Sequence, residues 1–432
     1  MSTSATLENP TWSNSKKIGF RFFFSYFALI ILFMNNGAYP FFSYIEGFYN
    51  DVLYKFIPWL GKVTFGITEV ATGPNGSGDT TYDYLLMFTI AIIALLSTVL
   101  WSILDRKSKH YVKMYYWLTL AIRTYVGLML ISYGMVKVIQ LQFSPPSIYR
   151  LTEAYGDSSP MGLAWTFLGF SKGYNLFMGI AEVAAVLLLF RRTLTFGLII
   201  TLMTTANVMA VNYFYDVPVK ILSTHLVIMT LFLLARDFNK LCQFFFMKKA
   251  IILTSLKKPK FKKGFNTFLL VIKILLLGYS IGYGAYSALD MKETYLGEST
   301  KSILKGYYEV NEYRVNDSIV DMSYKTDLSG VKTIIIDRKE RAFMEWKNGD
   351  KKWTRFELDS ITSNKVKLTT GGDIRDEYNL NYRKGEGSDF FFEGTVGSDK
   401  ILIKLTHTEN FRDKFLLTNR GFHWINERPF NR

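Results

Sequence analysis

Long apolar runs separated by short polar segments make up the chain as far as residue 288. Most of these runs carry no polar face, although a surface helix of a water-soluble protein would show one. A helix needs about 20 residues to cross the apolar core of a bilayer. We therefore predict a membrane α-helical bundle with about seven spans, at residues 18–36, 83–104, 114–141, 175–190, 193–215, 219–235 and 267–288.

The pattern changes after residue 301 to short segments in which apolar and polar residues alternate. Such alternation is typical of strands with one buried face, and Gly, Asn, Asp and Ser turns separate the segments. We count about ten segments without an intervening helix, the last two at residues 414–418 and 421–426. This arrangement predicts an all-β barrel or sandwich domain with antiparallel strands.

The positive charge of the chain is concentrated in particular loops. The net charge is +15, but the residues from Asp290 onward hold 25 Lys and Arg against 24 Asp and Glu. The excess belongs to the apolar region, where it gathers in alternate short loops, as it does in cytoplasmic loops of membrane proteins. This distribution argues against a nucleic-acid partner. It predicts a multi-pass protein of the bacterial inner (cytoplasmic) membrane with a cytoplasmic N-terminus and an exported, periplasmic β domain.

These patterns divide the chain into four parts. Residues 1–113 hold two spans and an outer loop, and residues 114–236 hold the next four spans. Residues 237–289 comprise a basic cytoplasmic loop, suited to a helix on an anionic membrane surface, and the last span. Residues 290–432 form the β domain. The single cysteine, Cys242, falls in the cytoplasmic loop, so the exported parts hold no disulfide.

Polar side chains in the outer half of the spans form the first candidate site. An ionisable group inside a bilayer needs a partner, a wet cavity or a route to the interface. Depth along the helices brings several such groups to one layer. We predict an outward-facing ligand pocket lined by Tyr133, Lys137, Glu182, Asn207, Asn212 and His225. Structural interpretations stay open, because Lys137 can extend to the surface and the Asn and His side chains can join helices.

The first outer loop provides a second candidate region. Residues 37–82 are rich in aromatic side chains at helical spacing, which predicts a helix lying along the outer surface. The loop ends in a segment that either caps the second span or covers the pocket as a lid. The lid alternative involves Asp79, Thr80, Thr81, Tyr82 and Asp83.

The last residues of the chain are dense in side chains that make specific contacts. They are either a final strand that plugs the barrel or a surface for a ligand or protein partner. The second alternative involves Arg420, His423, Trp424, Glu427 and Arg428.

The middle of the chain resembles the DoxX-like membrane proteins. RTYVGLMLISYGMVKV carries an Arg, spaced glycines and a Lys near its outer end, and FMGIAEVAAVLLLFRRT carries a Gly-x-x-Glu pattern with a basic turn. Together with TLTFGLIITLMTTANVMAVNYFYD, these segments are similar to a DoxX-like four-helix unit at residues 114–236, in a long Bacteroidota-type variant with a C-terminal β domain. The resemblance implies redox partners and a quinone- or lipid-like ligand.

We therefore expect an accessory or subunit of a membrane redox or envelope assembly that binds a small amphiphile. A quinone-like ligand is the candidate cofactor, membrane lipids and a periplasmic or membrane protein are the expected partners, and we assign no metal site. Two alternatives stay open. A helical bundle followed by a β domain is also similar to the vitamin K-dependent carboxylase-like proteins, which implies an enzyme using Lys137 and His225 on a hydroquinone. A scaffold for envelope proteins would bind no ligand.

Overall fold

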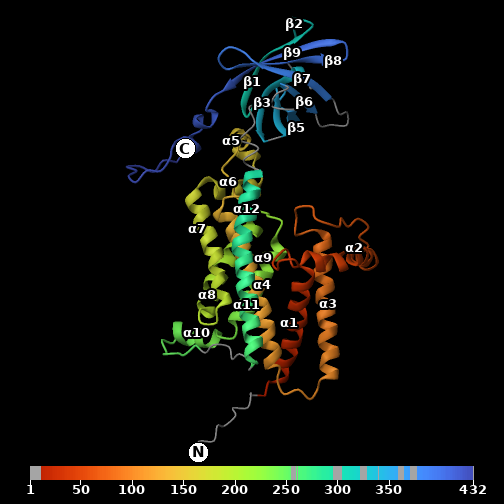
Figure 1. Cartoon of the computed structure of the whole chain (residues 1–432), viewed down its shortest axis with the longest axis vertical. Coiled ribbons are helices and arrows are strands. Elements are labelled where there is room, and N and C mark those ends of the chain that lie inside the picture. Colours follow the sequence, from red (N-terminus) through yellow and green to blue (C-terminus); the bar gives the residue numbers. More distant parts are fainter. Residues whose placement is uncertain are drawn as a thin grey trace, which may run out of the picture. The chain divides into compact units, whose positions relative to one another are not determined.

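The computed structural model describes residues 11–253, 259, 261–294, 304–321, 328–338, 340–358, 364–369 and 377–431 (Figure 1). The chain forms two compact units. The helical unit comprises Met1–Ser144 and Ser159–Ala288, and the barrel unit comprises Pro145–Ser158 and Leu289–Arg432. The chain therefore passes between the two units three times.

The longer elements of the helical unit follow the apolar runs. They are α1 (Asn14–Phe33), α2 (Ser43–Phe65), α3 (Thr81–Leu104), α4 (Val112–Val138), α6 (Pro160–Phe170), α7 (Lys172–Val183) with η2 (Ala184–Leu189), α8 (Leu194–Phe214), α9 (Lys220–Leu234), α10 (Phe238–Phe245) and α11 (Lys263–Gly278), which η3 (Tyr279–Tyr283) and α12 (Gly284–Lys292) extend. Five helical segments in the described residues are long and apolar enough to cross a membrane, or six if α9 and α10 count as one bent span. The total of seven spans stays a prediction.

The exposed surface of these helices is largely apolar. Leu95, Leu96 and Leu100 of α3 are exposed, as are Leu270 and Ile274 of α11. Water-soluble proteins rarely expose contiguous apolar surface of this kind, whereas lipid tails match it. The helical unit therefore indicates a membrane protein.

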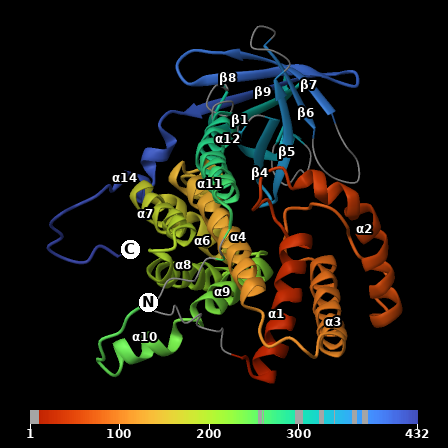
Figure 2. The same ribbon diagram turned by 60° about the horizontal axis from the view of Figure 1, so that its bottom comes forward.

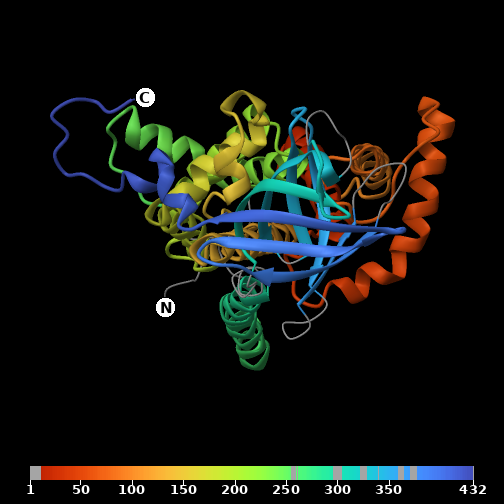
Figure 3. The same cartoon turned by 90° about the horizontal axis from the view of Figure 1, so that it is seen from above.

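Two helices take a different direction from the bundle. Helix α2 runs across α1 and α3 (Figure 1), contains Pro58 and bends along its course (Figure 3). Helix α10 turns away from α9 by 78° (Figure 2). Both expose large apolar side chains, among them Phe48, Trp59 and Phe245. This amphipathic character fits the two surface-lying helices that the sequence predicts.

Eight antiparallel strands close the barrel of the second unit. They are β1 (Gly306–Val315), β3 (Val331–Arg338), β4 (Glu340–Trp346), β5 (Lys351–Leu358), β6 (Lys365–Thr369), β7 (Glu377–Lys384), β8 (Asp389–Val396) and β9 (Asp399–Thr408). Each pairs with the next along the chain, and β9 pairs back with β1, whereas the short β2 (Ser318–Ile319) pairs with β1 alone. Alternate side chains such as Tyr308, Met344 and Phe392 fill the apolar interior.

The prediction of about ten strands is wrong at the C-terminal end. Residues 414–418 lie in the turn η6 (Phe411–Lys414) and the short helix α14 (Leu416–Asn419), and residues 421–426 form no strand. The pairing of β1 with β9 closes the barrel, so β9 pairs with β1 and β8 and not with a following strand. The last residues do not plug the barrel either, because Trp424 is 92% exposed.

The segment Pro145–Ser158 is built into the barrel unit, although β1 begins far later in the chain. It forms α5 (Ile148–Thr152) and the turn η1 (Tyr155–Asp157). Ile148 packs against Ile335 and Phe343 on the outer wall of β3 and β4. Ile335 is only 2% exposed although its neighbours along β3 fill the interior, because α5 covers the outer wall there.

Candidate functional site

The expected membrane pocket contains one buried ion pair. Lys137 of α4 and Glu182 of α7 lie 2.7 Å apart, Nζ to Oε2, and both are buried. The two helices approach closely here because position 134 is a glycine. A Cβ at Gly134 would lie only 2.8 Å from the carbonyl oxygen of Gly179. The ring of Tyr133 lies 5.7 Å from the Lys137 ammonium. Lys137 therefore does not extend to the surface, and Glu182 has the cationic partner that its position requires.

His225 belongs to a separate contact, between α9 and α1. Its Nδ1 lies 2.7 Å from the carbonyl oxygen of Ile221 and its Nε2 lies 2.8 Å from the Tyr26 hydroxyl. A carbonyl oxygen only accepts, so Nδ1 carries the proton, and in the neutral ring Nε2 accepts from Tyr26. Both nitrogens of His225 are thus occupied, Nδ1 within α9 and Nε2 in the contact between α9 and α1.

The two predicted asparagines do not join these groups. Asn212 donates from Nδ2 to the carbonyl oxygen of Val219 and so fixes the turn between α8 and α9. Asn207 is exposed on α8. In the part of the chain that the structure describes, no hydrogen bond or ion pair connects Asn207, Asn212 or His225 with the pair formed by Lys137 and Glu182.

The predicted lid residues have the geometry of helix caps. The carboxylate of Asp79 accepts from the backbone N–H groups of Lys220 and Ile221, at 2.7 and 2.9 Å, and so caps α9. Thr80 and Asp83 form a reciprocal capping box at the start of α3. Thr81 begins that helix and is exposed, whereas Tyr82 is buried against the ring of Tyr54.

The predicted partner surface at the C-terminus is largely exposed. His423, Trp424, Glu427 and Arg428 are exposed, whereas Arg420 is half-buried. The Arg420 guanidinium lies 3.9 Å from the centre of the Phe430 ring. The role of this segment as a surface for a ligand or protein partner stays a prediction.

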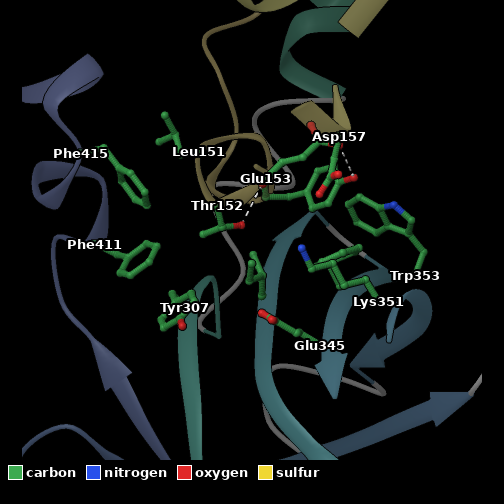
Figure 4. Close-up of a pocket in the computed structure, with 13 residues that line it drawn as sticks. Leu151, Thr152, Glu153, Asp157, Tyr307, Glu345, Lys351, Trp353, Phe411 and Phe415 are labelled. Atoms are coloured by element: carbon green, nitrogen blue, oxygen red, sulfur yellow. Dashed lines mark hydrogen bonds between the residues drawn. The ribbon is translucent and has the colours of Figure 1, made fainter. Parts of the chain in front are cut away.

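A cleft of about 590 Å³ lies between the α5 segment and the outer wall of the barrel (Figure 4). All of its residues belong to the barrel unit. They are Tyr149, Leu151, Thr152, Glu153, Asp157, Tyr307, Ile335, Phe343, Glu345, Lys351, Trp353, Phe411 and Phe415.

Aromatic rings form most of the cleft walls. On one side, Tyr149 contacts Phe343 and Trp353, with ring centres 4.3 and 5.0 Å apart. On the other side, Tyr307 of β1 stacks on Phe411 with ring centres 3.9 Å apart. Two aromatic groups thus face the same space from different strands and turns (Figure 4).

Carboxylates lie along the edge of the cleft. Glu153 is held by Arg150 and accepts a hydrogen bond of 3.2 Å from the Tyr149 hydroxyl. Burial and the neighbouring Glu153 raise the pKa of Tyr149, so its hydroxyl stays protonated at neutral pH. Asp157 and Glu345 add negative charge, and Lys351 opposite Glu345 is the one lining residue with a positive charge.

Comparison with known proteins identifies a relative that matches part of this chain. Uncharacterized protein YwoB from Bacillus subtilis (strain 168) is 37% identical over 121 residues, which are 27% of this chain and 75% of that protein. This chain belongs to the YwoB family. The name of YwoB states no activity, so the relationship assigns none to its relative. No family model matches the chain. No solved structure matches it.

The aromatic cleft of this YwoB relative was not predicted from the sequence. Its lining residues come from segments far apart in the chain, and periodicity within each segment does not indicate which strand lies beside α5. Two local features could have indicated the cleft. The first is the segment SIYRLTEAYGD, where two prolines precede a short apolar turn that contains Ile148 and Tyr149. The second is the pair of large aromatic side chains Phe343 and Trp353, which lie opposite each other on the outer wall of β4 and β5.

Proposed function

We propose that this protein is a membrane-embedded accessory protein of the bacterial inner membrane that binds a small amphiphile in the aromatic cleft of its periplasmic barrel unit. The cleft is the observation that carries this proposal. Its volume lies within the range of about 300–1,000 Å³ that is usual for small-molecule sites. Such sites combine mainly apolar walls with a few polar groups at defined positions, as this cleft does.

The walls favour a ligand with a flat or extended apolar body. Aromatic rings such as Tyr307 and Trp353 can stack on a planar ring or cover an alkyl chain. The edge favours a polar end that donates hydrogen bonds or carries positive charge, because Glu153, Asp157 and Glu345 all accept. A hydroquinone and a long-chain amine both meet these requirements. Either one keeps the quinone- or lipid-like class that the sequence suggests.

The chain connections support a common side for the cleft and the outer loops. Pro145–Ser158 follows α4 directly and belongs to the barrel unit. In the charge-based topology the loop after α4 lies outside, and the same topology places the end of α12 outside. The two independent connections to the barrel unit therefore agree on one side of the membrane.

The membrane layer gives less support to an enzyme. A general base must have a free position from which to reach a substrate proton. Lys137 is used by Glu182, and both ring nitrogens of His225 are used by α9 and α1. We therefore propose structural roles for these residues and a binding role for the cleft, and we retain the DoxX-like assignment of residues 114–236 as part of the proposal.

The test compares Trp353→Leu with Trp424→Leu in the full-length protein. Trp353 lines the cleft and Trp424 does not, so the second variant controls for the loss of a tryptophan. With a short-chain hydroquinone or dodecylamine as probe, the wild type and Trp424→Leu should gain thermal stability, whereas Trp353→Leu should lose most of the gain. Equal gains in all three proteins, or no gain with either probe, would contradict the proposal.

A further inference from the structure

Arg123 of α4 is a buried cation. It lies 11 residues after Val112, the first residue of α4, which is about 16 Å along the helix. The residue is 8% exposed, and its Nε is buried without a hydrogen-bond partner. Among the residues that the structure describes, Arg123 forms no hydrogen bond or ion pair.

Other cations surround this guanidinium. Helix α11 packs beside α4, because Leu276 and Leu277 lie against the cluster that contains Leu128 and Ile131. Lys273 of α11 is close enough to repel Arg123, and its ammonium lies 3.7 Å from the centre of the Phe190 ring. Arg191 and Arg236 add further positive charge near Arg123. The nearby carboxylate of Asp237 is already held by Arg236 and by the hydroxyl of Thr195.

A second buried arginine, Arg21, is satisfied by hydrogen bonds from within the protein. Arg21 of α1 donates to the Tyr111 hydroxyl, the Ser102 hydroxyl and the carbonyl oxygen of Asp105. A buried charge left without such partners destabilises a fold strongly. The like charges around Arg123 raise that cost further, since repulsion between them is weakly screened in an apolar medium. An anion bound among them would remove both penalties.

We infer that Arg123 and Lys273 bind the phosphate of an anionic phospholipid from the cytoplasmic leaflet. A guanidinium matches two phosphate oxygens at once, and basic sites between spans on the cytoplasmic side are typical sites for acidic headgroups. The neighbouring surface suits acyl chains, because Phe190, Leu270 and Ile274 are exposed there. This site is separate from the aromatic cleft and does not depend on it.

The experiment measures lipids that stay bound to the full-length protein after detergent washing, by native mass spectrometry. Phosphatidylglycerol, phosphatidylethanolamine and inorganic phosphate are the probes. The wild type should retain phosphatidylglycerol over phosphatidylethanolamine by about tenfold or more, which corresponds to about 1.4 kcal/mol. Arg123→Gln should lose that preference, and Lys273→Gln should weaken it.

Arg192→Gln is the matched control. It removes the same charge from an exposed position in the turn between η2 and α8, close to Phe190 in the chain. It should keep the preference for phosphatidylglycerol. Should Arg123→Gln fail to fold, Lys273→Gln decides the outcome against this control. Equal loss in Arg192→Gln and the two site variants, or no preference in the wild type, would overturn the lipid site. Retention of inorganic phosphate equal to that of phosphatidylglycerol would overturn it as well.

Discussion

The two units of this protein bury polar side chains in opposite ways. The helical unit buries charged groups, including Arg21, Lys137 and Glu182. Within the described residues of the barrel unit, the buried polar side chains are the hydroxyls of Ser329, Thr333 and Thr354, and none is charged. The charged side chains of the barrel lie on its surface, where the side chains of pairs such as Arg383 and Glu393 are 54% and 33% exposed.

This difference follows from what surrounds each unit. Lipid tails are as apolar as a helix surface, so burying leucine between two spans gains little, and polar contacts and small residues must hold spans together. A barrel in water gains stability by removing apolar side chains from the solvent. The same chain therefore needs two different kinds of core.

The largest expected effect breaks the buried ion pair of the helical unit. Glu182→Gln leaves the ammonium of Lys137 without a counter-ion, which should lower the free energy of unfolding by about 3–5 kcal/mol. The double variant Glu182→Gln with Lys137→Met buries no lone charge and should recover most of that loss. Reversible unfolding in mixed micelles measures both.

Asp216→Asn is the control for this pair, because it removes the carboxylate of an ion pair whose aspartate side chain is 82% exposed. Its effect should stay below about 1 kcal/mol. Additive losses from the single changes at Glu182 and Lys137 would mean that the two groups do not depend on each other, and the contrast between the units would lose its main support.

A smaller effect concerns the close approach of α4 and α7. An added methyl group in Gly134→Ala would lie 2.8 Å from the carbonyl oxygen of Gly179. The helices must separate, which should cost about 1–3 kcal/mol and loosen the neighbouring ion pair. Gly278→Ala in α11 is the control, since nothing lies within 4 Å of its added Cβ. Equal stability of the two variants, measured in the same micelles, would show that the glycine contact is dispensable.

The smallest effect tests the barrel unit through pH. Burial lowers the pKa of His407, with Glu409 opposing and Lys384 assisting the shift. The unfolded chain then binds more protons than the folded one as pH falls below about 6.5, so stability should decrease from about pH 7.5 to 5.5 by less than about 1 kcal/mol. Tryptophan fluorescence of the barrel unit during unfolding gives the slope.

His407→Gln should flatten the pH dependence in this window. The ring of His407 contacts Tyr308, with ring centres 4.9 Å apart, so the variant also tests whether packing alone explains the role of this residue. A slope unchanged by the substitution would assign the pH dependence to other groups. Asp389 is not among them in this window, because hydrogen bonds from Lys404 and Thr406 lower its carboxyl pKa.

Much of this architecture could be predicted from local patterns. The apolar runs gave the helices of the membrane region, and alternation gave the eight strands of the barrel, because each signal lies within one short segment. The pairing of Lys137 with Glu182 could also be anticipated, since Glu182 requires a cationic partner and Lys137 is the nearest cation to it by depth. Closure of the sheet remained open between barrel and sandwich, because it depends on the pairing of β1 with β9.

The functional regions depended on contacts that no local pattern reveals. His225 and Glu182 have comparable depths, but they face different helices, and depth alone does not fix the direction of a side chain. Tyr149 reaches Trp353 only because α5 lies on the barrel wall. The lack of a counter-ion for Arg123 among the described residues could not be predicted, because it depends on which side chains of α11 lie beside α4.

The insertion of Pro145–Ser158 has a consequence for the order of synthesis. Thr408, the last residue of β9, follows Ser158 by 250 residues. At about 5–20 residues per second, the ribosome needs roughly 12–50 s to complete the barrel after this segment emerges. During this time Ile148 and Tyr149 lack the strands against which they pack in the folded protein. A fragment that begins at Leu289 lacks this segment altogether, and we expect it to expose Ile335 and Phe343 and to aggregate.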